Sequence, residues 1–102
     1  MKLTITINDE KKEIELKNPR GRDVKKGLKL LISTQKLDDN EKIEKIEEYM
    51  DYIDIISAFN TGMTVDELDD LDADEKSKIN EFYASKVTSR LDFLKSSLMP
   101  EN

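Results

Sequence analysis

The spacing of the apolar residues changes once along this chain, close to residue 17. Before that point Leu3, Ile5 and Ile7 alternate with polar residues, which is the period of a β-strand with one apolar face. Beyond it, apolar residues recur at intervals of three or four positions, which is the period of an amphipathic helix. The pattern therefore predicts an α+β fold that is mainly α, with the β-structure at the N-terminus.

The N-terminal part, residues 1–17, is predicted to be a β-hairpin. Ile14 and Leu16 continue the alternation after a stretch whose composition is typical of a turn. If all apolar residues share one face, Ile5 pairs with Ile14 and Leu3 with Leu16, and the turn falls at Asp9-Glu10. A lone hairpin is marginally stable in water, so we expect helices or a second subunit to cover its apolar face.

Residues 20–98 are predicted to contain three principal helices and one short acidic helical turn. The apolar rows of these elements are, in order, Val24, Leu28, Leu31, Ile32 and Gln35; Ile43, Ile46, Tyr49, Met50, Ile53, Ile56 and Phe59, within a helix over about 40–60; Val65, Leu68 and Leu71, pointing inward; and Ile79, Phe82, Tyr83, Val87, Leu91, Leu94 and Leu98. We expect one domain over residues 1–98 and a short tail over 99–102.

Three local signals mark the helix ends and one close contact. Thr64 and Glu67 have the spacing of a capping box, and Gly62 is a plausible end for the long second helix. Asp38 and its neighbours are candidate N-caps for that helix. Gly27 lies inside the first helix, where it costs about 1 kcal/mol relative to alanine, so we expect another element to pack closely against it.

The composition excludes several classes of function. The 102 residues include no Cys and no His, which removes disulfides, Cys/His zinc sites and His-dependent nucleophilic catalysis. A net charge of −6 argues against general binding of nucleic acids or anionic membranes. No stretch approaches the length of a membrane span, and a cytoplasmic location is the default. We expect a non-enzymatic binding protein without a cofactor or a metal.

The net charge is the sum of two differently charged parts. Residues 1–38 carry 10 basic and 6 acidic side chains, whereas residues 39–102 carry 7 basic and 17 acidic ones. One interpretation is that the basic first helix packs beside the acidic second helix, so that the charges cancel within the domain. The other is head-to-tail self-association, in which the basic end of one copy meets the acidic end of the next.

The acidic segment after residue 65 contains a near match to a calcium-binding loop. Asp70, Asp72 and Asp74 occupy the first ligand positions, and Glu81 occupies the last. Glu75, however, stands where the sharp turn of such a loop requires glycine. Acidic residues at the start of a helix are the favoured interpretation, and a calcium-binding module remains a third class.

The order of these pieces resembles a known family. The residues that carry the resemblance are the basic helix at 21–30, the segment Tyr49–Asn60, and the run Met63–Asp74 that follows it, with its Thr-Val-Asp-Glu-Leu start and Leu-Asp-Ala-Asp end. Together with the N-terminal hairpin they resemble the tail assembly chaperones of siphovirus-type phages and prophages of Gram-positive bacteria. The chain departs from the family at Asp70, where we would expect glycine, and in its longer last helix.

The resemblance implies a role in virion assembly in the host cytoplasm, without incorporation into the mature virion. Proteins of this family bind the tape measure protein and keep it soluble while the tail tube assembles around it. The implied partners are therefore the tape measure protein, possibly the tail tube protein, and further copies of this chain in an oligomer. Neither a nucleic acid nor a membrane is an implied partner.

Binding of an amphipathic helical client would use apolar positions that the core does not need. The candidates are Tyr52, Ile55, Phe59, Tyr83, Phe93 and Leu98. The alternative for each of them is a place in the core. The alternative function is an acidic inhibitor that mimics DNA, which would present rows of carboxylates at phosphate-like spacing and would have no affinity for an apolar helix.

Overall fold

The described part of the chain begins with a hairpin and continues with four helices. The computed structural model describes residues 1–7, 9–34 and 38–98, and for residues 7 and 94–98 it describes the backbone alone. The elements are β1 (Lys2–Ile7), β2 (Glu10–Glu15), α1 (Gly21–Ser33), α2 (Asp39–Thr61), α3 (Val65–Asp69) and α4 (Ala73–Leu98). The expected α+β class, mainly α with an N-terminal hairpin, is confirmed. Gln35 and the tail at 99–102 lie outside the described residues.

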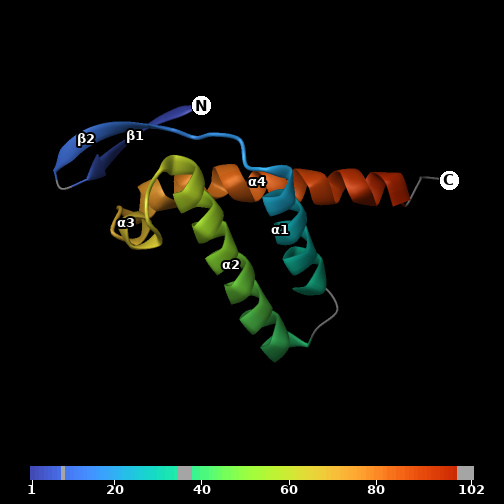
Figure 1. The fold of residues 1–102 in the computed structure, drawn as a ribbon. Coiled ribbons are helices and arrows are strands. Elements are labelled where there is room, and N and C mark those ends of the chain that lie inside the picture. The colour runs from blue at the N-terminus through green and yellow to red at the C-terminus, as the bar shows by residue number, and fades with distance from the viewer. Residues whose placement is uncertain (8, 35–37, 99–102) are drawn as a thin grey trace.

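Helix α4 is the longest element, and the other elements are arranged along it (Figure 1). Helices α1 and α2 are neighbours, and each of them also contacts α4. The hairpin and α3 lie near the end at which α4 begins, whereas the other end of α4 extends past α1 (Figure 1). The molecule measures 53 × 30 × 21 Å, so long stretches of its helices have a neighbour on one side only.

The pairing of β1 with β2 corrects the expected register. Ile14 lies opposite Leu3, and Lys12 lies opposite Ile5, so the strands are displaced by two residues from the expected pairing of Ile5 with Ile14 and Leu3 with Leu16. The last pair joins residues 7 and 10, so the turn does not fall at Asp9-Glu10. Two-residue turns favour Asn and Asp over Glu because their central residues take positive φ, and Asp9 has a φ of 63°. A displacement of two residues keeps the apolar side chains on the same face.

A single core joins all the elements. Its buried apolar residues are Ile5, Ile14 and Leu16 from the hairpin; Leu28 from α1; Ile53, Ile56 and Ala58 from α2; Leu68 and Leu71 at α3; and Ile79, Tyr83 and Val87 from α4. The three α4 residues follow one another at intervals of one helical turn and are fully buried. The helices thus cover the apolar face of the hairpin, as its marginal stability requires.

The predicted helix ends agree with the structure. Thr64 and Glu67 form the complete capping box, with both side chains accepting from backbone N–H groups at 3.1 Å. Asp38 caps α2 by accepting from the N–H of residue 41 at 2.9 Å, and Gly62 ends α2 with a φ of 73°. One expectation is wrong: Val65 does not point inward, because as the first residue of α3 it is 36% exposed.

The calcium-loop hypothesis is also wrong. Helix α4 begins at Ala73, so Asp74 and Glu81 are helical residues and the segment from Asp70 to Glu81 is not a loop. The Asp72 carboxylate accepts from the N–H of Asp74 at 3.1 Å, which is a helix-start interaction. Glu75, in the first turn of α4, accepts instead from the Thr6 N–H of β1 at 2.9 Å and so ties the helix to the hairpin.

Further polar interactions hold α4 in place. The Tyr83 hydroxyl donates to the carbonyl oxygen of Lys17 at 2.9 Å and fastens the segment after the hairpin. Between α2 and α4, Asn80 donates to Asp54 at 2.9 Å, and Lys76 lies 3.4 Å from Asp54 and 2.8 Å from Asp69. None of the helices within the described ranges is both long enough and apolar enough to cross a bilayer.

The close approach expected at Gly27 is confirmed. A Cβ atom at this position would lie 3.0 Å from Cγ2 of Val87, which is fully buried, so the Val87 side chain would have to shift. Replacing Gly27 by alanine gains about 1 kcal/mol of helix propensity but overpacks the contact at a cost of about 1–3 kcal/mol. We expect Gly27→Ala to lower the free energy of unfolding by about 1 kcal/mol, measured by urea denaturation. In a Val87→Ala background the same change should be neutral or stabilising; an equal loss in both backgrounds would contradict the contact.

Burial gives Tyr83 a pH dependence that can be measured. Burial raises the pKa of Tyr83 to about 12, above the value of about 10 for an exposed tyrosine. The folded state therefore favours the neutral phenol, and this contribution to stability is fully present below pH 10 and is lost between about pH 10 and 12. We expect the unfolding free energy of Tyr83→Phe to be about 1 kcal/mol lower at pH 7, because the bond to Lys17 is gone, and to fall less steeply above pH 10. Parallel profiles for both proteins would show that Tyr83 titrates normally.

Candidate functional site

Three of the predicted client-binding residues form one surface patch on α2. Tyr52, Ile55 and Phe59, which we call the aromatic patch, lie within two turns of the helix and face the start of α1. Ile55 is 54% exposed and Phe59 is 62% exposed, whereas Tyr52 is half-buried and packs against the core. Apolar side chains of this size are usually buried, so this exposed patch is a candidate binding surface.

An ion pair at the start of α1 holds the aromatic patch. The Arg20 guanidinium donates to both oxygens of Asp23, at 2.9 and 3.3 Å, and its Cζ lies 4.7 Å from the centroid of the Phe59 ring. The Tyr52 hydroxyl donates to the same carboxylate at 3.4 Å. Asp23 is buried and lies in the first turn of α1, where a negative charge is favourable. The sequence pattern did not point to Arg20 or Asp23, because their role depends on the contact between α1 and α2.

The pKa values at the patch follow from these contacts. The hydrogen bond from Arg20 to Asp23 raises the pKa of Arg20, and the negative charge of Asp23 adds to the effect. Burial raises the pKa of Tyr52, and the nearby Asp23 carboxylate raises it further. Arg20 therefore stays charged and Tyr52 stays neutral near pH 7. A hollow of about 90 Å³ lies among these side chains and Ile56, with space for one apolar group of a partner.

The other three predicted client-binding residues are not part of the aromatic patch. Tyr83 is fully buried at the centre of the core, so its assignment to a binding surface is corrected: it is a core residue. Phe93 is 57% exposed on α4, with the Arg90 guanidinium 5.2 Å from its ring. The side chain of Leu98 lies outside the described residues. The spacing of apolar residues along the sequence does not distinguish the buried Tyr83 from the exposed Phe93, because both aromatic residues occur on the same helix, α4.

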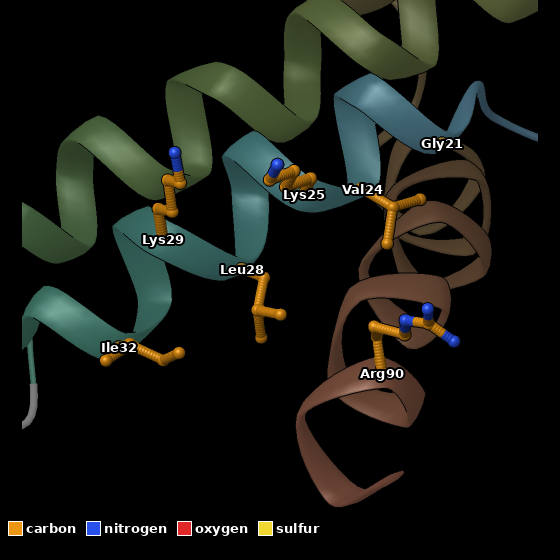
Figure 2. A pocket seen from close by; sticks show the side chains of 7 residues that line it. All are labelled: Gly21, Val24, Lys25, Leu28, Lys29, Ile32 and Arg90. Atoms are coloured by element: carbon orange, nitrogen blue, oxygen red, sulfur yellow. The ribbon is translucent and has the colours of Figure 1, made fainter. Parts of the chain in front are cut away.

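A second surface, which the sequence pattern did not predict, is a groove between α1 and α4. Its volume is about 710 Å³, and Figure 2 shows the residues that line it, which are Gly21, Val24, Lys25, Leu28, Lys29, Ile32 and Arg90. Apolar side chains of α1 form its floor, and the basic side chains stand along its rim. We call it the α1–α4 groove. It lies beside the half of α4 that extends past α1.

A third surface is an apolar ridge on the first half of α2, formed by Ile43, Ile46 and Met50. These side chains are 58%, 45% and 59% exposed. They continue the row that is buried further along the helix at Ile53. In its first half, α2 diverges from α4. The two helices leave an open hollow there, which is lined by Tyr49, Met50 and residues of α4. Of the seven residues in the predicted apolar row of α2, four are therefore exposed: the three ridge residues and Phe59.

Comparisons with known proteins give no further assignment. No protein-family model matches the chain. Neither a curated protein nor a solved structure matches it. The function is therefore argued from the three surfaces, the aromatic patch, the α1–α4 groove and the α2 ridge.

The contribution of Asp23 through its contacts with Arg20 and Tyr52 can be tested separately from the general benefit of a negative charge in the first turn of a helix. Asp23→Asn removes the negative charge that pairs with Arg20 and one of the two oxygens that accept hydrogen bonds from Arg20 and Tyr52, and we expect the free energy of unfolding to fall by about 1 kcal/mol in urea denaturation. Asp39→Asn is the matched control, because Asp39 is also in the first turn of a helix but is exposed. The control should cost about 0.3–0.5 kcal/mol. Equal effects of the two substitutions would mean that the Arg20–Asp23–Tyr52 contacts do not stabilise the fold.

Proposed function

We propose that this protein is a phage tail assembly chaperone that binds the tape measure protein without catalysis and keeps it soluble while the tail tube assembles. The observation that carries the proposal is the aromatic patch, in which Ile55 and Phe59 stay exposed in a chain of which only 36% is hydrophobic. A domain with so few apolar residues gains no stability from leaving two large ones in water. Their exposure is accounted for if a partner covers them.

In this proposal the client is an amphipathic helix whose apolar row covers the aromatic patch. Phe59 and Ile55 contribute apolar area, and the hollow beside Tyr52 accepts a side chain of the client. Arg20 is already held over Phe59 by Asp23, so little side-chain freedom is lost on binding. The net charge of −6 would keep the complex soluble.

The resemblance supplies the identity of the client and the setting. On that basis the protein acts in the host cytoplasm, is absent from the mature virion, and meets the tail tube protein as a possible second partner. The alternative, an acidic inhibitor that mimics DNA, needs rows of carboxylates and no apolar surface. A row of carboxylates is present on α2 at Glu44, Glu47 and Asp51, but it runs directly beside the exposed Ile43, Ile46 and Met50. The apolar neighbours favour the chaperone.

Co-expression tests the proposal. The protein is produced together with the tape measure protein of the phage or prophage that encodes it, and the soluble fraction of the client is measured with and without the chaperone. We expect the chaperone to raise that fraction and to co-purify with the client. Ile55→Asp with Phe59→Asp should abolish both effects without loss of folding, because the two side chains are exposed.

The control is Val65→Asp, which places one carboxylate on an exposed apolar position outside the aromatic patch. It should leave client solubility unchanged. Failure of the wild-type protein to change the solubility of the client, with no co-purification, would overturn the chaperone proposal. Loss of activity in Val65→Asp to the same degree as in the patch variant would overturn the assignment of the site.

A further inference from the structure

Helix α1 carries an apolar row and a basic row side by side in the α1–α4 groove. Val24, Leu28 and Ile32 follow one another at intervals of four residues along the floor. Lys25 and Lys29 each stand one position further along the chain, which on a helix is a rotation of about 100°. The basic row therefore borders the apolar row on one side, and Arg90 of α4 stands across the groove (Figure 2).

The α2 ridge has the same arrangement with the opposite charge. The ridge residues Ile43, Ile46 and Met50 are exposed, and Glu44, Glu47 and Asp51 each stand one position further along the chain. The acidic row thus borders the ridge on the same rotational side as the basic row borders the groove floor. The same protein presents an apolar floor with basic neighbours and an apolar ridge with acidic neighbours.

Within the part of the chain that the structure describes, these two charged rows form no ion pairs with each other. Helices α1 and α2 are adjacent, but no salt bridge joins them in the described part of the chain. Within that part, Lys25, Lys29 and Arg90 have no acidic partner within 4.0 Å, and neither Glu44, Glu47 nor Asp51 has a basic one. Helices α1 and α2 do pack side by side, as the first interpretation of the charge distribution expects, but their charged rows form no ion pairs with each other in the described residues.

We propose that the α2 ridge of one copy binds in the α1–α4 groove of a second copy. The ridge supplies three exposed apolar side chains, and the groove supplies an apolar floor with about 710 Å³ of space above it. When the two helices lie antiparallel, the rows displaced by one residue fall on the same side of the contact. Glu44, Glu47 and Asp51 then face Lys25 and Lys29, which fixes the polarity of the pair.

The two surfaces lie on different sides of the molecule. Met50 borders the hollow between α2 and the first half of α4, whereas the groove is bounded by α1 and by Arg90 in the second half of α4. A ridge and a groove on different sides make a heterologous contact. After each copy is added, the assembly still has one free groove at one end and one free ridge at the other. The association is therefore head-to-tail and continues beyond a dimer.

Two complementary variants test this arrangement. Lys25→Glu with Lys29→Glu disables the groove and keeps the ridge, and Ile43→Lys with Met50→Lys disables the ridge and keeps the groove. All four positions are exposed, so both variants should fold, which circular dichroism checks. Lys11→Glu with Lys78→Glu is the control for the groove variant, because it makes the same change of net charge as that variant at exposed positions outside both surfaces.

Sedimentation velocity over a range of concentrations gives the readout. We expect the wild type and the control to rise in mass from 11.8 kDa to more than twice that value, and each variant alone to stay at 11.8 kDa. An equimolar mixture of the two variants should stop at twice the monomer mass, since one intact groove meets one intact ridge. High salt should weaken the association.

Several results would overturn the inference: a wild type that stays monomeric, variants that still associate alone, or a mixture that forms no dimer. A groove variant that loses the tape measure protein but self-associates like the wild type would assign the groove to the client. The inference is independent of the proposed function. The Ile55→Asp, Phe59→Asp protein should self-associate normally, so failure of one proposal is distinguishable from failure of the other.

Discussion

Three side chains of α4 form the support on which the rest of the structure depends. Ile79, Tyr83 and Val87 are fully buried and follow one another at intervals of one turn, so they make a single row along the helix. Tyr83 reaches the segment after the hairpin through its bond to Lys17, and Val87 meets the backbone of α1 at Gly27. The hairpin, α1 and α2 each have too few apolar residues to form a core without this row.

Because the elements meet along one row, the fold has few places where a side chain is buried. Three places have a neighbouring element on one side only. They are the first half of α2, the region near Arg20 where the start of α1 meets the end of α2, and the outer side of α1. Apolar residues at these places stay in contact with water, although the chain has a small supply of them. The three exposed surfaces are thus a consequence of the architecture, and the charged residues beside them give each surface a different electrostatic character.

The sequence predicts the elements better than the surfaces. Alternation, the capping box at Thr64 and the glycines at 27 and 62 are local signals, and each was confirmed. The predicted hairpin register differs by two residues from the observed one because parity specifies the face of a strand but not its partner. Turn chemistry decides between registers with equal parity, and Asp9 takes the positive φ that such a turn requires. Ile46 and Ile53 belong to the same apolar row, yet one is exposed and the other buried, because α4 reaches only the second. The helical spacing of apolar residues predicts the face of the helix on which a side chain lies. It does not predict whether another element packs against that face.

The central claim is that the exposed apolar residues are binding surfaces and that the row on α4 is the core. Methyl NMR of isoleucine-labelled protein, with a soluble paramagnetic agent, tests it most directly, because isoleucines occupy the core, the aromatic patch and the α2 ridge. The account predicts strong relaxation of Ile43, Ile46 and Ile55 in the dilute free protein and protection of Ile53 and Ile79. Addition of the tape measure protein should protect Ile55, and concentrating the protein alone should protect Ile43 and Ile46. Protection of all five methyls in the dilute free protein, or no change at Ile55 with the client, would contradict the account.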